Sequence, residues 1–423
     1  MRILVIGSGA REHALLRALH RDPGVTELHV APGNAGTDVL ATAHPVEVAD
    51  PASIAALATE LAPDLVVIGP EVPLIAGATD RLRANGIATF GPTAAAARIE
   101  GSKAFAKEVM APAGVATGRA FVVDSAGQLA AALDATGAPY VVKDDGLAAA
   151  KGVVVTDDRS VAERHANEVL AGGRPVLVEE FLAGPEVSLF AVCDGTRAVP
   201  LLPAQDFKRI GDGDAGRNTG GMGAYAPLPW APADLTETAM RTIVDPVLAE
   251  LARRGTPFCG LLYAGLVLTA AGPKVIEFNC RFGDPETQVV LELLDYPLGA
   301  LLAAAASGSL EGIALQWKTG AAVTVVIAAE NYPDTPVTGD RVTGLPADGV
   351  GAVVLHAGTK RTADGGIVSA GGRVLSATAT GGTLAEARDR AYALVDGVRM
   401  RGSQHRNDIA AAAIAGDIAV PAE

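Results

Sequence analysis

The chain is short of cysteine, of positive charge and of long apolar runs, and each shortage excludes a class of protein. Its three cysteines, among 423 residues, have neither the spacing of a metal site nor the even number of a disulfide framework. Acidic residues outnumber basic ones by 48 to 34, and the formal net charge of −14 argues against a nucleic-acid partner. No run reaches the roughly 18 apolar residues that span a bilayer, so no membrane partner is expected. These features predict a cytoplasmic protein in a reducing compartment.

The first hundred residues alternate short apolar runs with amphipathic segments. This pattern predicts a parallel, doubly wound α/β sheet, whose ligands bind beyond the carboxyl ends of the strands. The expected strands are Ile3–Ile6, Leu28–Val30, Leu65–Ile68 and Ala88–Phe90, and the expected helices are Arg11–His20, Ile54–Leu61 and Leu74–Asn85. Loops that let a ligand approach the backbone follow three of the strands, at Gly7–Gly9, Ala31–Gly36 and Gly69–Glu71.

Gly7 and Gly9 match part of the dinucleotide-binding motif. Glu12 stands where the third glycine belongs, and the acidic residue expected after the second strand is absent, because Val30 is followed by Ala31. A nicotinamide or flavin site is therefore disfavoured. A phosphate at the N-terminus of the first helix remains compatible with the sequence.

From Gly101 the pattern changes to hairpins mixed with helices, which predicts an α+β region. The expected strands are Phe121–Val123, Tyr140–Lys143, Val153–Thr156, Val176–Glu180, Glu186–Val192, Leu261–Thr269 and Lys274–Asn279. A long polar loop is expected over Gln205–Tyr225 and a helix near Leu235–Arg253. The residues from Ala321 onward are rich in valine, threonine and glycine, and predict a small β-rich domain with a closing helix near Leu384–Val398.

The strand that ends at Asn279 has the pattern of a metal site. Alternation places Glu277 and Asn279 on one face of this strand, two residues apart. A carboxylate and an amide oxygen that point the same way suit Mg²⁺, which completes its shell with substrate phosphates. Arg281 follows, where its fork of donors can hold a carboxylate or a phosphate. The alternative is a strand edge with solvated polar residues.

A second group of residues has the pattern of a polyphosphate site. Lys143 ends a strand, and the hairpin Gly146–Gly152 that follows carries Lys151 and can fold over phosphates. The hairpin leads into a strand, so it is not a Walker A loop, which opens a helix. Solvated lysines on a mobile hairpin are the alternative. Glu179–Leu182 resembles a hinge whose backbone can pair with adenine, and Glu186 could take ribose hydroxyls.

The order of these parts is similar to an ATP-grasp domain, in which two α+β lobes clasp ATP. Motifs along essentially the whole chain resemble the phosphoribosylamine–glycine ligase family. They are Gly7–Ala14, Pro32–Gly36, Gly69–Glu71, Gly91–Thr93, Glu100–Phe105, Asn218–Tyr225, Glu277–Glu286, His356–Thr359 and Gly371–Val374.

The resemblance implies an N-terminal preATP-grasp domain of residues 1–100, an ATP-grasp domain of residues 101–315 and a C-terminal domain of residues 321–423. The smaller lid lobe would span about residues 121–182. The implied reaction joins glycine to 5-phosphoribosylamine and gives glycinamide ribonucleotide, ADP and phosphate. The implied cofactors are ATP and Mg²⁺ or Mn²⁺, and a monomer is favoured as the oligomeric state.

The resemblance also implies roles for individual residues. The ATP site would comprise Lys103, Lys143, Lys151, Gly152, Glu179, Glu180, Phe181, Leu182 and Glu186. The metal would lie on Glu277 and Asn279. The sites for glycine and phosphoribosylamine would be lined by Gly7, Gly9, Asn34, Glu71, Lys208, Gly220, Gly221, Met222 and Arg281.

Three positions depart from the family pattern. Asp144 replaces an alanine and adds a negative charge near the phosphates, and Ala150 replaces a glycine, at a cost of about 1 kcal/mol if its φ is positive. Arg217 replaces a proline. The strand before Glu277 reads Tyr263–Leu266 and offers no second metal carboxylate. The alternatives are another ATP-grasp carboxylate–amine ligase and a catalytically inert nucleotide sensor.

Overall fold

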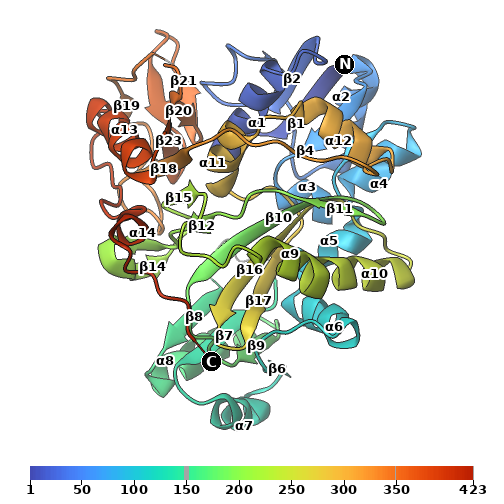
Figure 1. Ribbon diagram of the computed structural model, residues 1–423, viewed down its shortest axis with the longest axis vertical. Helices are drawn as coiled ribbons and strands as arrows, with labels where there is room; N and C mark the ends of the chain where they lie inside the picture. Colours follow the sequence, from blue (N-terminus) through green and yellow to red (C-terminus); the bar gives the residue numbers. More distant parts are fainter. Residues whose placement is uncertain (147–151, 348, 423) are drawn as a thin grey trace.

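The computed structural model describes residues 1–146, 152–347 and 349–422, and arranges them around four main sheets (Figure 1). None of the helices in these ranges is long and apolar enough to cross a membrane. Ala150 and Lys151, for which the sequence analysis made predictions, lie outside the described ranges.

The N-terminal sheet is parallel throughout, with the strand order β3-β2-β1-β4-β5. Its strands are β1 (Arg2–Gly7), β2 (Glu27–Pro32), β3 (Thr42–Ala43), β4 (Leu65–Ile68) and β5 (Thr89–Phe90), and its helices are α1 (Ala10–His20), α2 (Pro51–Leu61), α3 (Glu71–Ile75), α4 (Ala78–Ala84) and α5 (Ala94–Gly101). The predicted doubly wound sheet is confirmed, and the ends of β2, β1 and β4 lie side by side. The single helix expected over Leu74–Asn85 is wrong, because Gly77 has φ +90° and separates α3 from α4.

The lid sheet is a separate antiparallel layer, with the order β6-β9-β7-β8. It comprises β6 (Ala120–Val123), β7 (Tyr140–Asp144), β8 (Val153–Thr156) and β9 (Val176–Glu179), with α7 (Ala126–Thr136) and α8 (Arg159–Ala171). Its buried side chains form an apolar cluster of their own, which includes Leu133, Val142 and Val178. The helix α6 (Lys103–Ala113) leads into this sheet from the N-terminal one.

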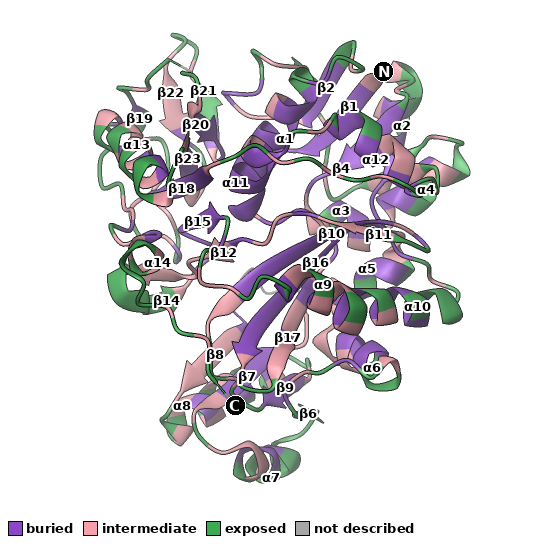
Figure 2. Cartoon of the chain, viewed as in Figure 1, coloured by how far each residue is buried: buried purple, intermediate pink, exposed green. Residues whose placement is uncertain are grey.

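The central sheet, β11-β10-β16-β17, carries the strand pair predicted for the metal. Its strands are β10 (Glu186–Asp194), β11 (Ala198–Pro200), β16 (Cys259–Thr269) and β17 (Gly272–Asn279). Figure 2 shows β10 and β16 buried along most of their length. The helix expected near Leu235–Arg253 is α9 (Leu235–Ala239), a π-helical turn (Met240–Val244) and α10 (Asp245–Arg253), while α11 (Glu286–Leu293) and α12 (Leu298–Ala306) follow the sheet.

The C-terminal sheet, β12-β15-β18-β23-β20, corrects the expectation of a long polar loop. Two of its strands, β12 (Gln205–Asp206) and β15 (Gly223–Ala226), come from that segment. All four residues of β15 are buried, and the strand pairs with β18. The remaining elements are β18 (Ala321–Ala328), β20 (Ala352–His356), β23 (Arg373–Gly381), α13 (Leu384–Gly397) and α14 (Ala411–Ala415), with two small sheets, β13 (Arg209–Gly211) with β14 (Ala215–Asn218), and β19 (Arg341–Val342) and β21 (Thr359–Arg361) on either side of β22 (Ile367–Ser369).

The N-terminal and C-terminal parts are joined through the backbone of His356. Its N–H donates to Nδ1 of His13 on α1 at 2.9 Å, and its carbonyl accepts from Nδ2 of Asn34 at 2.8 Å. Burial, followed by the charges of His356 and Arg17, lowers the pKa of His13 to about 3. The His13 ring is only 4% exposed, so it stays neutral in the folded protein.

This junction predicts a loss of stability in acid. The unfolded chain gains a proton on His13 as the pH falls below about 6.5, while the folded chain does not until about pH 3. Stability therefore falls as the pH decreases through this window, by on the order of 5 kcal/mol at most from this group. His13→Asn keeps an acceptor for the His356 N–H without a titrating ring, so its melting temperature should depend less on pH between 4 and 7.

The matched control is His20→Asn, at an exposed position of the same helix. It should melt with the same pH dependence as the parent. Equal slopes for the parent and His13→Asn would contradict the account of the junction.

Candidate functional site

The face that carries Glu277 is defined by strand register. Gly265 of β16 lies opposite Glu277 of β17 and opposite Ser188 of β10, and Tyr263 lies opposite Asn279. Residues that oppose one another across a sheet project from the same face, so Glu277 and Asn279 share a face as predicted. A Cβ at Gly265 would stand 3.3 Å from Cγ of Glu277, so glycine leaves the carboxylate its space.

The carboxylate of Glu277 is half-buried, and no hydrogen bond or ion pair reaches it from the described part of the chain. Burial alone would raise its pKa, but Lys208, Lys143, Lys103 and Arg281 together hold the pKa below its ordinary value. An ionised carboxylate without a direct partner, beside an amide oxygen on the same face, fits a hard divalent cation. The described residues contain no group of three or more histidine, cysteine or acidic side chains placed to hold a metal by themselves.

Further carboxylates lie close to Glu277, and the sequence analysis missed two of them. Burial raises the pKa of Asp206 to about 8, where Glu286, Glu186 and Glu277 add to the rise and Lys208 opposes it. Glu286 accepts from the Ser188 hydroxyl at 3.1 Å. The signals were available, because Asp206 and Lys208 are two residues apart, as in a strand, and Glu286 ends a quoted motif.

Two of the predicted residues bind each other. Lys208 Nζ lies 2.6 Å from Oε2 of Glu186, which begins β10. The side chain of Glu186 remains 43% exposed, so its other oxygen is still open to a ligand.

Arg281 is held by carboxylates from the N-terminal part. Its guanidinium lies 3.2 Å from Glu71 and 2.9 Å from Glu100, and donates to Oδ1 of Asn279 at 3.3 Å. Burial raises the pKa of Glu100, while Arg281 and Arg11 outweigh burial and lower the pKa of Glu71. The structure therefore brings Arg281, Glu71 and the end of β17 together, and a ligand carboxylate would compete with Glu71 for the guanidinium.

The two predicted phosphate lysines point into the space between the lid sheet and β17. Lys103, at the start of α6, donates to the carbonyls of Asp144 and Gly146 at 2.9 and 3.1 Å. Lys143, on β7, donates to the carbonyl of Ile276 at 3.1 Å and forms an ion pair with Glu179 at 2.6 Å. Burial lowers the pKa of Lys103, against the attraction of Glu277. Gly152 closes the base of the hairpin through its carbonyl, which accepts from the Asp144 N–H at 2.7 Å.

Glu179 has a different environment from the one expected. Its carboxylate is 2% exposed and also pairs with Lys107, a residue that the sequence analysis missed. Lys107 lies four residues after Lys103, the spacing that places two side chains on one face of a helix. The next hinge residues, Glu180 and Phe181, are exposed, and the Glu180 N–H donates to the carbonyl of Arg119 at 2.8 Å. Leu182 is half-buried.

At the N-terminal sheet, the Glu12 carboxylate lies at the N-terminus of α1, beside the Gly7–Gly9 turn. Its carboxylate accepts from the Gly9 N–H and from Arg11, both at 2.6 Å. A Cβ at Gly69 would lie 2.0 Å from Oε1 of Glu12, so the end of β4 must be glycine. Gly7 and Asn34 lie at the same edge, where Nδ2 of Asn34 donates to the Ser8 carbonyl at 2.8 Å. These contacts explain why the dinucleotide motif is incomplete.

The Gly220–Met222 loop is fixed by Arg373, another residue absent from the expected set. The Arg373 guanidinium donates to the carbonyl of Asp284 at 2.6 Å and lies 3.1 Å from its carboxylate. It also donates to the Gly220 carbonyl. The Gly221 N–H donates to the Thr219 hydroxyl at 3.0 Å, and the Met222 side chain is fully buried. Its backbone is also engaged, because the Met222 N–H donates to the carbonyl of Phe207 at 2.8 Å and its carbonyl accepts from the Val326 N–H at 2.9 Å. Met222 therefore supports the loop from beneath, and no atom of it is exposed to a ligand.

Two of the departures from the family pattern have partners in the structure. Asp144 is 3% exposed and forms an ion pair with Arg174, whose side chain is 52% exposed. The added negative charge is therefore compensated within the lid sheet. Arg217 forms an exposed ion pair with Asp334. Ala150, like Lys151, lies outside the described residues.

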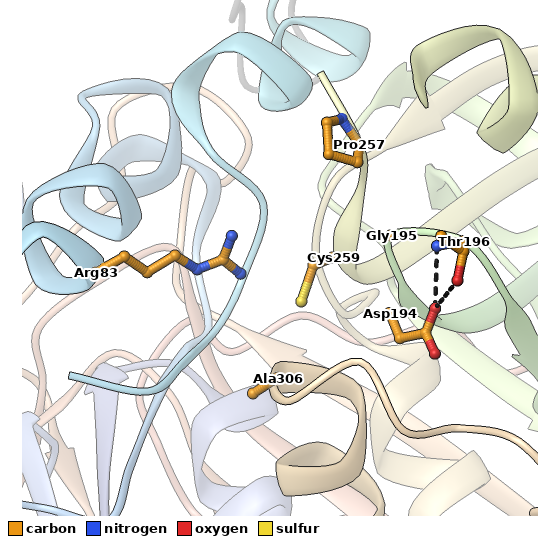
Figure 3. Close-up of a pocket in the computed structure, with 7 residues that line it drawn as sticks. All are labelled: Arg83, Asp194, Gly195, Thr196, Pro257, Cys259 and Ala306. Carbon is orange, nitrogen blue, oxygen red and sulfur yellow. Dashed lines mark hydrogen bonds between the residues drawn. The ribbon is translucent and has the colours of Figure 1, made fainter. Parts of the chain in front are cut away.

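A hollow of about 280 Å³ lies away from this face, between α4, the β10–β11 turn and the end of α12 (Figure 3). Its charged residues are already engaged. Asp194 accepts from the Thr196 backbone and hydroxyl at 3.0 Å, and Arg83 donates to the carbonyls of Thr89 and Gly91 at 3.3 Å. The Cys259 thiol, which also lines the hollow, donates to the carbonyl of Ala305 at 3.3 Å, and burial raises its pKa. The hollow is therefore not the candidate site.

Comparison with known proteins identifies the family. Three models of phosphoribosylglycinamide synthetase match the chain: the N domain over residues 1–100, the ATP-grasp domain over 101–287 and the C domain over 322–412. A phosphoribosylamine–glycine ligase of Mycobacterium leprae is 60% identical over 99% of this chain and 100% of its own length. One from Streptomyces coelicolor is 60% identical over 98% of this chain and 99% of its own.

Solved structures agree with this assignment. A crystal structure of phosphoribosylamine–glycine ligase from Thermotoga maritima has a TM-score of 0.84 and 36% identity, and covers 97% of this chain and 100% of its own. A biotin carboxylase domain from Hydrogenobacter thermophilus, solved with MgADP, shares the fold at a TM-score of 0.74 and 17% identity, over 96% and 91% of the two chains. The chain belongs to the phosphoribosylamine–glycine ligase family of ATP-grasp enzymes.

The Asp144–Arg174 pair predicts an asymmetric mutational effect. Arg174→Ala leaves a buried carboxylate unpaired and should destabilise the protein by about 2 kcal/mol, whereas Asp144→Ala removes the buried charge and should change stability by less than about 1 kcal/mol. Thermal melting of both variants measures this difference. Arg341→Ala, which breaks an exposed pair with Asp364, is the control and should cost at most about 1 kcal/mol. Equal losses for Arg174→Ala and Asp144→Ala would show that Asp144 needs no compensation.

Proposed function

We propose that the chain, as a member of this family, joins glycine to 5-phosphoribosylamine with ATP as the energy source. The products are glycinamide ribonucleotide, ADP and phosphate, in de novo purine biosynthesis. The observation that carries the proposal is the Glu277 carboxylate, which lacks a partner within the described residues and is surrounded by four cations. Such a site stabilises the charge of transferring phosphates.

The chemistry explains why ATP is needed. A carboxylate does not react with an amine at neutral pH, because the leaving group would be oxide. Transfer of the γ-phosphoryl group of ATP to the glycine carboxylate gives glycyl phosphate and ADP. The amine of phosphoribosylamine then attacks the acyl carbon and phosphate leaves, so the protein must mainly position the reactants and neutralise charge.

The proposed metal ligands are Glu277 and Asn279, which would hold Mg²⁺ or Mn²⁺ from one face of β17. When bound, the ion supplies further neutralisation of the phosphate charge. The chain itself contributes Lys103 and Lys143, whose ammonium groups each keep a donor beyond the contacts described above. These two lysines would contact the phosphates, and the backbone of Glu180–Leu182 would frame adenine. Glu186 would take the ribose through its open oxygen.

The substrate side of the site lies where the N-terminal, central and C-terminal parts meet. Arg281 is suited to hold the glycine carboxylate, because its present partner Glu71 can be displaced by another carboxylate. Gly7, Gly9 and Asn34 on one side and Gly220 and Gly221 on the other would line the phosphoribosylamine site. Water must be excluded from glycyl phosphate, and the lid sheet, with its separate core, is suited to close over it.

The proposed domains are residues 1–100, 101–315 and 321–423, and the proposed lid lobe spans about residues 121–182. Two strands from residues 101–315, β12 and β15, pair within the C-terminal sheet. The proposed partners are the small-molecule substrates, and a monomer is the proposed oligomeric state. A cytoplasmic location accords with the three buried, unpaired cysteines.

The direct test is ADP release from ATP with glycine and freshly made phosphoribosylamine. ADP should form at a substantial rate only when both substrates are present, and glycinamide ribonucleotide should accumulate in equal amount. Release that requires neither substrate, or that requires another carboxylic acid in place of glycine, would overturn the proposal.

Glu277→Gln should lower turnover at least about a hundredfold, because the variant loses the charge that holds the metal beside the phosphates. The rate is measured with saturating Mg²⁺, and thermal melting checks that the variant is folded. Glu311→Gln is the matched control, since its exposed side chain forms an ion pair with Arg197 at the surface. Near-normal turnover of a folded Glu277→Gln would remove this residue from the metal site.

A further inference from the structure

Two lysines share one buried carboxylate between the lid sheet and β17. Lys107 on α6 and Lys143 on β7 form ion pairs with the two oxygens of Glu179 at the end of β9. All three side chains are largely buried, with exposed fractions of 17%, 6% and 3% for Lys107, Lys143 and Glu179. The two ammonium groups and one carboxylate leave a surplus of one positive charge.

The two lysines differ in how many of their donors are used. Lys107 Nζ donates to Glu179, to the Thr117 hydroxyl at 2.7 Å and to the Gly118 carbonyl at 2.8 Å, which uses all three N–H groups of an ammonium. Lys143 Nζ donates to the Ile276 carbonyl and lies 2.6 Å from Oε2 of Glu179, an ion pair without hydrogen-bond geometry. Among the described residues, Lys143 therefore keeps at least one open N–H even if Glu179 takes another. Lys143 can therefore donate to a phosphate, and Lys107 cannot.

We propose that Lys107 is a positioning residue of the nucleotide site, which acts through Glu179 to keep the charge of Lys143 available for the phosphates. Lys107 occupies Oε1 of Glu179, so that Lys143 faces only the other oxygen. Without Lys107, both oxygens of Glu179 would be available to Lys143. One carboxylate would then neutralise one ammonium group, so no surplus of positive charge would remain. The free N–H of Lys143 would be attracted to Glu179 and not to a phosphate. The inference rests on the proposed nucleotide site.

The position of Ile276 strengthens this assignment. The register between β16 and β17 shifts after Gly265, so Ile276 is an extra residue in β17, and its carbonyl is the second partner of Lys143. Glu277 is the next residue. Glu179 and Ile276 together thus fix the Lys143 ammonium beside the proposed metal ligand. Lys107 offsets the negative charge of Glu179 through the other carboxylate oxygen.

The test is a double-mutant cycle on nucleotide affinity, with ADP and Mg²⁺ as the probe in calorimetry. Lys107→Met should weaken ADP binding about tenfold, and should raise the ATP KM more than it lowers kcat. Glu179→Gln in the same chain should restore most of the affinity, because a neutral amide does not neutralise Lys143. A double variant that binds ADP no better than Lys107→Met would overturn the proposal.

A third variant separates charge balance from simple support. Lys107 also touches Thr117, whose hydroxyl donates to the Val275 carbonyl of β17 at 2.7 Å. Thr117→Val removes this link and keeps all three charges, so ADP affinity should stay within about twofold of the parent. A loss as large as that expected for Lys107→Met would show that support of β17 is what matters. This comparison holds even if Lys107→Met fails to fold.

Lys360→Met, at an exposed position of β21, is the control for loss of a lysine and should bind ADP as the parent does. Because ADP binding needs neither glycine nor phosphoribosylamine, the two proposals can fail separately. A parent chain that binds ADP but makes no glycinamide ribonucleotide would refute the function alone. An active parent whose ADP affinity is unaffected by Lys107→Met would refute the role of Lys107 alone.

Discussion

The candidate site depends on an excess of buried positive charge between the lid sheet and β17. Lys103, Lys107 and Lys143 converge there, and Glu179 is the only carboxylate that forms an ion pair with any of them among the described residues. Buried ammonium groups are costly unless they are paired, so this excess favours the arrival of a polyanion. Among the described residues, Glu277 lies beside them without a direct partner. A polyphosphate that carries a divalent cation would neutralise the lysines and Glu277 together.

The rest of the fold brings the residues proposed to bind glycine and phosphoribosylamine close to this charge. The parallel sheet brings Gly7, Asn34 and Glu71 to one edge, and Glu71 forms an ion pair with Arg281 at the end of β17. The C-terminal sheet is locked to the same edge through the His356 backbone. Three parts that are far apart in sequence therefore enclose one face of the central sheet. The lid sheet keeps its own core, and it is joined to β17 through the hydrogen bond from Lys143 to the Ile276 carbonyl.

Features with a local signal could be predicted from the sequence. The parallel sheet follows from its apolar runs, and the shared face of Glu277 and Asn279 follows from the two-residue period of a strand. Features that depend on distant pairing could not. Ile276 is an extra residue only with respect to the register of β17 against β16. The ion pair of Glu179 with Lys107 requires α6 to lie against β9. The segment that forms β15 was expected to be a loop, and it is a strand because it pairs with β18. Lys107 could have been predicted as a neighbour of Lys103, because the two lie four residues apart on one helix.

The central claim is that this charge serves phosphoryl transfer to a carboxylate, and oxygen labelling tests it most directly. The protein is supplied with glycine labelled with heavy oxygen in its carboxylate, with ATP and phosphoribosylamine, and the products are analysed by mass. Attack on glycyl phosphate leaves one labelled oxygen in inorganic phosphate, with ADP unlabelled. Label in AMP, or unlabelled phosphate alongside newly formed glycinamide ribonucleotide, would contradict the account.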